Sequence, residues 1–151
     1  MKNDPLDEPH VIRVFVDAKI LGRDDPTKPK RTFVAYVVEN RPASQGFTEI
    51  KEEGADETDQ AELHAIAFAI RELRQDFSEF TVMSDNQSVV DVIHRSSEGL
   101  PKPKGILAEI REQRSRNLSI QVQWYEKNPA HRVLNAHVLK YLEGEHNSSN
   151  P

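Results

Sequence analysis

Apolar and polar positions in the first third of the chain follow the pattern of β-strands. Residues 11–17 and 31–40 are rich in Val, Ile, Ala and aromatic side chains, and residues 47–53 alternate as a half-exposed strand does. The linkers between them contain Gly, Pro and Asp, which favour loops and turns. These three segments therefore predict an antiparallel meander.

The apolar period changes to that of a helix between residue 58 and about residue 76. Thr58 or Asp59 is expected to be its N-cap. One stripe of this helix carries six apolar side chains: Ala61, Ala65, Ile66, Ala69, Ile70 and Leu73. The stripe predicts a helix that packs one face against the core.

Two more strands and three more helices are expected in the rest of the chain. The strands are predicted over 80–85 and 118–126, and the helices over 86–96, 106–116 and 131–143. A right-handed crossover through the first helix makes the first and fourth strands parallel. The sequence therefore predicts an α/β domain with a five-stranded mixed sheet, three antiparallel strands followed by parallel strands, flanked by helices.

Both ends of the chain are polar. Residues 1–10 and 144–151 are charged or rich in Pro, Ser and Asn, so we expect them to be disordered tails. The domain proper is then residues 11–143. A chain of 151 residues is the length of one ordinary domain.

Composition excludes several kinds of site. The absence of cysteine excludes disulfides and thiolate metal sites and is compatible with the cytoplasm, which is the expected location. No segment approaches the ~20 apolar residues of a membrane span, and the N-terminus lacks the apolar core of a signal peptide. The net charge of −5 argues against binding of nucleic acid by bulk positive charge.

Aspartates end two of the strands that are expected to be parallel. Asp17 follows VIRVFV and Asp85 follows FTVMS, and ligands collect outside the carboxyl ends of such strands. Glu62 lies near the start of the first helix. Each acid alone has a simpler explanation: a solvated strand end, a favourable place in the helix dipole, or an N-cap. Their order along the chain is what suggests a joint role.

Three motifs in this order, VFVDAKILG, TDQAELHAI and TVMSDNQSVV, resemble the pattern of type 1 ribonuclease H. In that family an Asp ends the first strand, an AE opens the first helix, and an SD or TD ends the fourth strand. The resemblance extends from residue 11 to about residue 142 and implies the ribonuclease H-like sheet. It also implies a metal-dependent endonuclease that hydrolyses the RNA strand of RNA–DNA hybrids and leaves a 5′-phosphate and a 3′-hydroxyl.

The resemblance assigns Asp17, Glu62 and Asp85 as ligands of two divalent ions, Mg²⁺ or Mn²⁺, with Asp17 bridging both. Two-metal hydrolysis of a phosphodiester needs such a set of oxygen ligands, one ion serving the attacking water and the other the leaving oxygen. Carboxylates are the ligands that Mg²⁺ favours. The resemblance therefore implies a metal-binding hydrolase.

The fourth ligand of the family, an Asp near the start of the last helix, is absent. NAHVL places His137 there, as in the AH variants of reverse-transcriptase-like members, and an imidazole ligand predicts more activity with Mn²⁺ than with Mg²⁺. A different gap would place Leu134 at that position. His131 is a second candidate, because many members carry a mobile His in the preceding loop that activates water or releases product. Either histidine is also compatible with an ordinary surface position.

Candidate contacts with the hybrid flank the expected metal ligands. These are Thr58, Gln60, Asn86 and Gln87. Recognition of RNA in a hybrid depends on its 2′-hydroxyls, which polar side chains bind. Asp59 stands where the family favours Asn, and its charge would repel a phosphate.

Basic residues after the fourth strand are few. Some family members carry a basic, aromatic handle there, whereas this chain has only SSEGLPKPKG. Lys102, Lys104, Arg111 and Arg114 are candidates for a reduced basic strip that contacts substrate. A Glu112–Arg116 pair at i, i+4 indicates that part of this helix is a solvated face, and Trp124 on the fifth strand is expected in the core.

Other functions remain open. Proofreading 3′–5′ exonucleases carry Asp-x-Glu on the first strand, where this chain has Lys19, and integrase-like enzymes carry their Glu last. A ribonuclease H-like module that binds nucleic acid or protein without catalysis is favoured by the missing terminal Asp, by a Lys19 able to neutralise Asp17, and by the negative net charge. A small α/β scaffold whose acids only cap its elements is the third alternative.

Overall fold

The computed structural model describes residues 12–95 and 105–148. Within these ranges the chain forms five strands and four helices: β1 (Arg13–Leu21), β2 (Arg31–Val38), β3 (Arg41–Ile50), α1 (Thr58–Leu73), β4 (Phe80–Ser84), α2 (Gln87–His94), α3 (Ile106–Arg116), β5 (Ile120–Trp124) and α4 (Ala130–Ser148). The predicted order of elements is confirmed. The expected tail of residues 1–10 lies outside the described residues.

The strands form one mixed sheet in the order β3-β2-β1-β4-β5. β1, β2 and β3 pair antiparallel, whereas β4 is parallel to β1 and β5 is parallel to β4. A parallel pair needs a long crossover, which α1 provides between β3 and β4. The predicted α/β fold, three antiparallel strands followed by parallel ones, is therefore confirmed.

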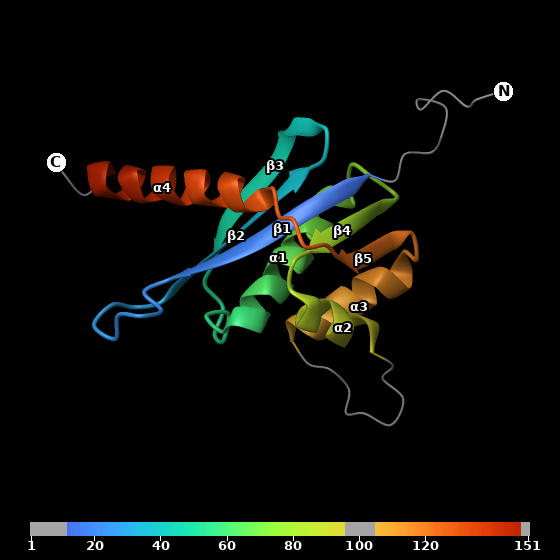
Figure 1. The fold of residues 1–151 in the computed structure, drawn as a ribbon, viewed down its shortest axis with the longest axis horizontal. Coiled ribbons are helices and arrows are strands. Elements are labelled where there is room, and N and C mark those ends of the chain that lie inside the picture. Colours follow the sequence, from blue (N-terminus) through green and yellow to red (C-terminus); the bar gives the residue numbers. More distant parts are fainter. Residues whose placement is uncertain (1–11, 96–104, 149–151) are drawn as a thin grey trace.

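The helices cover the two faces of the sheet unequally. α1, α2 and α3 lie together on one face, with α1 against β1, β2 and β4 and α2 against β5. α4 packs against β1 and β2, and Figure 1 shows it crossing the sheet apart from the other three helices. The result is a three-layer domain with a core on each side of the sheet.

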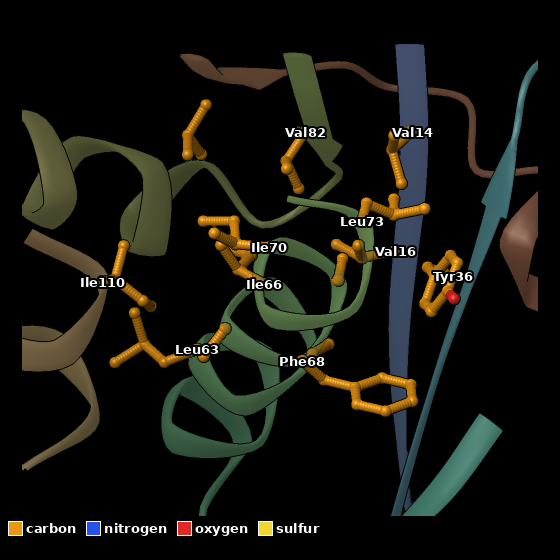
Figure 2. Packing of buried hydrophobic residues seen from close by; sticks show 14 of the residues in the cluster. Val14, Val16, Tyr36, Leu63, Ile66, Phe68, Ile70, Leu73, Val82 and Ile110 are labelled. Carbon is orange, nitrogen blue, oxygen red and sulfur yellow. The ribbon is translucent and has the colours of Figure 1, made fainter. Parts of the chain in front are cut away.

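The larger core lies between the sheet and α1. All six residues of the predicted apolar stripe on α1 are buried. Figure 2 shows Ile66 and Ile70 of α1 between the strand residues Val14 and Val82 and the α3 residue Ile110. Complete burial of one such side chain contributes about 1.5–3 kcal/mol, so this layer is the main source of stability.

A smaller core fixes α4 on the opposite face. Leu134 and Val138, one turn apart on α4, pack against Phe33 and Ala35 of β2. The ring of Phe33 also stacks on Phe47 of β3, with 5.7 Å between ring centroids. Because these contacts hold the start of α4 over β1 and β2, they determine which α4 side chains reach the middle of β1.

The first strand is longer than the sequence predicted. It was expected to end at Asp17, but β1 continues to Leu21 and pairs with β2 throughout, with Asp17 opposite Ala35. β4 pairs with β1 only as far as Phe15 and Met83. The antiparallel hairpin thus extends β1 past the end of its parallel neighbour. Asp17 is inside a strand, yet it lies just beyond the carboxyl end of β4.

The second hairpin is tighter than predicted. Residues 41–46 were expected to form the turn, but they belong to β3, and Glu39 and Asn40 connect the strands. Asn40 has a φ of 61°. Asn tolerates this left-handed conformation better than most residues, so a two-residue turn is formed at lower cost.

The cap of α1 also differs from the prediction. Glu57, not Thr58 or Asp59, is the N-cap, and its carboxylate accepts hydrogen bonds from the backbone N–H groups of Asp59 and Gln60. A glutamate reaches two donors of the first turn at once, which satisfies two groups that the helix leaves unpaired. The helix therefore begins where it was expected, with a different residue capping it.

Trp124 was expected in the core and is instead 45% exposed. It is the last residue of β5, which is an edge strand with a neighbour on one side only. An amphipathic indole at the end of an edge strand keeps one part in solvent. The apolar character of the residue therefore did not predict its place.

The last helix is longer than predicted. α4 runs to Ser148 instead of ending at residue 143, so the prediction of a disordered tail is wrong for residues 144–148. Arg31 forms an ion pair of 2.8 Å with Glu145, which ties this final part of α4 to β2. Even so, no helix in the described part of the chain has the length and apolar character required to cross a membrane.

Gly46 is required by the packing of β3 on β2. It lies opposite Tyr36, and a Cβ at residue 46 would overlap the Tyr36 ring. The ring is also held by Phe68, with 5.4 Å between centroids. We expect Gly46→Ala to lower the free energy of unfolding by about 1–3 kcal/mol, measured by urea denaturation.

Gly144→Ala is the matched control. No atom lies within 4 Å of a Cβ added at Gly144. Alanine also favours a helix over glycine by about 1 kcal/mol, so this variant should be at least as stable as the parent. Equal stability of Gly46→Ala and the parent would contradict the close packing of Tyr36.

Candidate metal centre

Three acidic side chains from three separate elements meet at one edge of the sheet. Asp17 belongs to β1, Glu62 to the second turn of α1, and Asp85 directly follows β4. One carboxylate oxygen of each lies within 4.8 Å of the other two. These are the acids that the sequence analysis expected to meet.

The sheet topology brings them together. β4 ends at Ser84, so Asp85 leaves the sheet beside the part of β1 that contains Asp17. The crossover helix α1 begins at the same edge, which places Glu62 above the gap. This is the edge at which ligands collect in parallel sheets.

The three carboxylates differ in environment. Asp17 and Glu62 are only 7% and 5% exposed, whereas Asp85 is exposed. Burial raises the pKa of Glu62 to about 8, the hydrogen bond from Ser84 Oγ (2.8 Å) opposes the rise, and the charges of Asp17 and Asp85 add to it. Burial likewise raises the pKa of Asp17, against a hydrogen bond from His131. The pair Asp17 and Glu62 therefore resists full ionisation unless a cation is present.

Asn128 is a site residue that the sequence analysis missed. Its Nδ2 donates to the Val16 carbonyl at 3.1 Å and to Asp85 Oδ2 at 3.2 Å. Its Oδ1 accepts from the backbone N–H of Ala130 at 3.1 Å. One side chain thus connects β1, the acid after β4 and the start of α4. The KNPA segment was interpreted only as a breaker, and no motif marked its Asn.

His131 lies beside Asp17. The imidazole Nδ1 donates to Asp17 Oδ2 at 2.9 Å, and its side chain is 66% exposed. The residue is in the first turn of α4, and the smaller core holds this turn over β1. Of the two histidines considered in the sequence, this is the one that reaches the acidic group.

His137 does not reach the acidic group, so its prediction as the fourth metal ligand is corrected here. Its Nε2 donates to Gln45 Oε1 at 3.0 Å, and its ring stacks on Phe47 with 5.2 Å between centroids. Six residues turn an α-helix by about 600°, so His137 and His131 face directions roughly 120° apart. Leu134, the alternative from a different gap, is fully buried in the smaller core.

Lys19 contacts α4 and does not neutralise Asp17. Its Nζ donates to Asn135 Oδ1 at 2.8 Å. Lys19 is two residues beyond Asp17 on β1, and Asn135 is one turn beyond His131 on α4. The two elements are therefore linked by two successive polar contacts, His131 with Asp17 and Lys19 with Asn135.

Asn86 has a structural role at the start of α2. Its Oδ1 accepts from the Val89 N–H at 3.1 Å, which makes it the N-cap, so the alternative in which Asp85 caps this helix is wrong. Its Nδ2 donates to Asp59 Oδ1 at 3.0 Å. This bond joins the first turns of α1 and α2 beside the acidic group.

Of the other residues that were expected to contact the substrate, three are exposed and two lie outside the described residues. Thr58, Gln60 and Gln87 are exposed at the starts of α1 and α2, close in sequence to the acids. Lys102 and Lys104 lie outside the described residues. These three side chains are therefore accessible at the starts of the two helices, whereas the hydrogen bonds to the acids come from Ser84, Asn128 and His131.

Comparisons with known proteins agree on the architecture. No protein-family model matches the sequence, and no curated protein is significantly similar to it. Among solved structures, LC11 ribonuclease H1 in complex with an RNA/DNA hybrid has a TM-score of 0.63 at 18% identity, over 87% of this chain and 99% of that one. The foamy viral protease-reverse transcriptase in complex with double-stranded DNA has a TM-score of 0.62 at 14% identity, over 85% and 89%.

The native prototype foamy virus protease-reverse transcriptase has a TM-score of 0.61 at 19% identity, over 81% of this chain. The chain has a ribonuclease H-like fold. It spans 18% of that viral protein, so the likeness concerns one part of a larger polypeptide. At these identities the comparisons establish the fold of the chain and no more.

The donor set of this ribonuclease H-like domain fits a hard divalent cation. All three converging ligand atoms are carboxylate oxygens, which suit Mg²⁺ or Mn²⁺. Within residues 12–95 and 105–148 no Lys or Arg forms an ion pair with any of the three acids. Among the described residues His131 is thus the one basic side chain paired with these acids, and Asp17, Glu62 and Asp85 are the residues that would hold the ions.

The raised pKa of Glu62 predicts a pH-dependent stability without metal. Between its ordinary value of about 4.5 and the folded value of about 8, the unfolded chain releases the proton more readily than the folded one. The free energy of unfolding should therefore fall as the pH rises through this window. Glu62→Gln removes the ionisation, so at about pH 8 it should be about 1–3 kcal/mol more stable than the parent in EDTA, with little difference at about pH 5.

The measurement is urea denaturation in EDTA at several pH values. Glu53→Gln is the control, because Glu53 is exposed and should give the parental pH dependence. If Glu62→Gln were less stable than the parent at every pH, the glutamate would instead be a structural acceptor for Ser84.

Proposed function

We propose that this chain is a metal-dependent endonuclease that hydrolyses the RNA strand of RNA–DNA hybrids. The observation that supports the proposal most is the convergence of three carboxylates at the carboxyl edge of a ribonuclease H-like sheet. The hybrid-bound state of LC11 ribonuclease H1 gives the substrate class by analogy. The products would carry a 5′-phosphate and a 3′-hydroxyl.

Two divalent cations, when bound by the acids, would supply Lewis-acid stabilisation of the attacking and leaving oxygens. The protein contributes a preorganised ligand set. Glu62 is fixed by the hydroxyl of Ser84, and Asp85 by the amide of Asn128. Because these partners are neutral, they orient the carboxylates without cancelling the charge that binds cations.

His131 is proposed to move protons between the site and solvent. Its Nδ1 is held by Asp17 and its side chain is largely exposed, so Nε2 is the ring atom proposed to exchange a proton. An imidazole can both accept and donate a proton, which suits this task. The proposal assigns His131 a role in proton transfer or product release and does not include it among the metal ligands.

Recognition of RNA is proposed to come from the polar groups of the two helix starts. Thr58, Gln60 and Gln87 are exposed there, and their side chains can donate to or accept from a 2′-hydroxyl. The Asn86–Asp59 hydrogen bond holds the Asp59 carboxylate toward the start of α2. These contacts would select an RNA strand beside the acids.

A binding module without catalysis is the second candidate. It is favoured by one observation: the side chains by which the first turns of α4 contact β1 include His131 and Asn135, and neither is an acid. Three acids without a carboxylate from the start of α4 would bind the ions more weakly than four acids. Weak or absent cleavage with intact hybrid binding would then be the natural state of the chain.

Removal of the carboxylate of Asp17 or of Asp85 is expected to abolish cleavage. Asp17→Asn and Asp85→Asn should each lower the rate of internal RNA cutting in a labelled hybrid by about a thousandfold or more, since a lost ligand forfeits several kcal/mol of transition-state stabilisation. Asp24→Asn, an exposed acid in the β1–β2 loop, should cleave as the parent does.

Duplex DNA and duplex RNA are the comparison substrates in the same assay. Persistent hybrid binding without cutting by the parent in any metal would support the binding module and overturn the enzyme. Cleavage that survives in both Asn variants would show that the activity belongs to a contaminant or to another site.

The metal preference is expected to follow the oxygen ligands. An imidazole ligand at His137 was the reason to expect a preference for Mn²⁺, and that residue lies against Phe47 instead. With three carboxylates alone, Mg²⁺ should support at least as much cleavage as Mn²⁺. Metal-titrated cleavage assays of the parent and of His137→Ala should give the same preference; a loss of Mn²⁺-dependent cleavage only in the variant would restore His137 as a ligand.

A further inference from the structure

A second site with concentrated charge lies between α2, α3 and the edge strand β5. The structure has a cavity of about 520 Å³ there, lined by Arg95, Arg111 and Arg114 and, among the described residues, by no acidic one. Ser115 and Gln121 add polar groups to the lining, and Leu118, 79% exposed, adds an apolar one. We refer to the three arginines and this cavity as the arginine pocket.

The arginine pocket contrasts with the rest of the molecule. The chain carries a net charge of −5. Four other arginines pair with glutamates: Arg13, Arg31, Arg71 and Arg116. In the part of the chain that the structure describes, no carboxylate pairs with Arg95, Arg111 or Arg114. Three guanidinium groups thus share one cavity without an anion from the described residues.

Backbone carbonyls hold two of these side chains in place. Arg111 Nη2 donates to the carbonyls of Val92 (2.8 Å) and Arg95 (3.1 Å) at the end of α2, and Arg114 Nε donates to that of Ile120 (3.3 Å). A guanidinium has five N–H donors, so each group keeps donors for a ligand. Because the arginines are already positioned, an anion would bind with a smaller loss of side-chain entropy.

Arg114 is partly buried and has no carboxylate partner among the described residues. Burial lowers the pKa of its guanidinium, and no partner charge offsets this effect. A charged group that is partly removed from water is unfavourable unless it is paired. A phosphate fits this need because its oxygens accept two parallel N–H bonds from one guanidinium.

The arginine pocket lies at the opposite end of β5 from the candidate metal centre. β5 begins at Ile120, which lines the pocket, and ends at Trp124, which pairs with Ser84 just before Asp85. Four strand steps span about 13 Å. A nucleic-acid strand carries one phosphate per ~3.4 Å of duplex axis, so this length of β5 corresponds to about four phosphate spacings.

We propose that the arginine pocket binds the phosphodiester backbone of the duplex a few nucleotides from the bond held at the acids. This inference rests on the proposed function and adds a sequence-independent contact to it. Arg95 and Arg114 face the phosphates, and Arg111 positions the end of α2 that carries Arg95. The arginine pocket would thus supply positive charge next to the short sequence SSEGLPKPKG, which stands where some ribonucleases H carry a longer basic handle.

The test changes Arg95 and Arg114 to glutamine and leaves Arg111, which holds α2, unchanged. Affinity for a labelled RNA–DNA hybrid is measured in EDTA over a series of KCl concentrations. Each variant should bind several-fold more weakly, and the slope of log affinity against log salt should fall by about 0.9 for each lost phosphate contact. In the presence of metal, KM should rise while kcat stays near the parental value.

Arg116→Gln is the matched control, since it removes the same charge from α3 outside the arginine pocket and should retain the parental salt slope. Parental affinity and slope in both pocket variants, in a parent that binds and cleaves the hybrid, would overturn this inference and leave the proposed function intact. A parent that binds through the pocket without cleaving would support the inference and overturn the enzyme.

A parent that neither binds nor cleaves would overturn both. Loss of folding in Arg114→Gln, detected by circular dichroism, would leave the decision to Arg95→Gln, because the Arg95 side chain makes no hydrogen bond in the described residues. Arg114→Lys then separates charge from geometry: it should keep the salt slope and lose part of the affinity.

Discussion

β4 pairs with β1 over three residues and then stops, whereas β1 continues beside β2 as far as Leu21. Because β4 ends first and leaves a space beyond its end, Asp17 in the middle of β1 lies next to Asp85 at the β4–α2 junction. α1 must begin at the same edge to connect β3 with β4, so its second turn closes the space from above. The mismatch in strand length thus sets the position of Asp17, Glu62 and Asp85 before any ligand is considered.

Such a space would be unfavourable for three acids if nothing compensated them. In the described residues no Lys or Arg pairs with these acids, and the geometry is fixed by a hydroxyl, an amide and an imidazole that each hold one acid. Folding stability and cation binding are therefore in opposition. The ionised carboxylates that lower the free energy of unfolding of the metal-free domain at high pH are the same groups that attract a cation. The contacts that resolve this opposition come from Ser84, Asn128 and His131, and two of them belong to the segment around the start of α4.

The sequence was sufficient for the element order, the mixed sheet and the three acids, because these follow from periodicity and from motifs that lie within single elements. It was insufficient where the outcome depends on contacts between distant elements. The extension of β1 past Asp17 depends on pairing with β2, and the choice of His131 over His137 depends on the rotation of α4, which Leu134 and Val138 set by packing on β2. Asn128 had no motif of its own, since its three partners are brought to it only by folding.

The chain contains one tryptophan, and it is half in solvent at the end of β5, paired with the residue before Asp85. Its indole is therefore a built-in optical probe. A change in the polarity or charge of its surroundings alters the wavelength and intensity of fluorescence emission, and no other residue contributes a competing tryptophan signal. Occupancy of this edge of the sheet can be followed in the unlabelled protein by a shift in its emission spectrum.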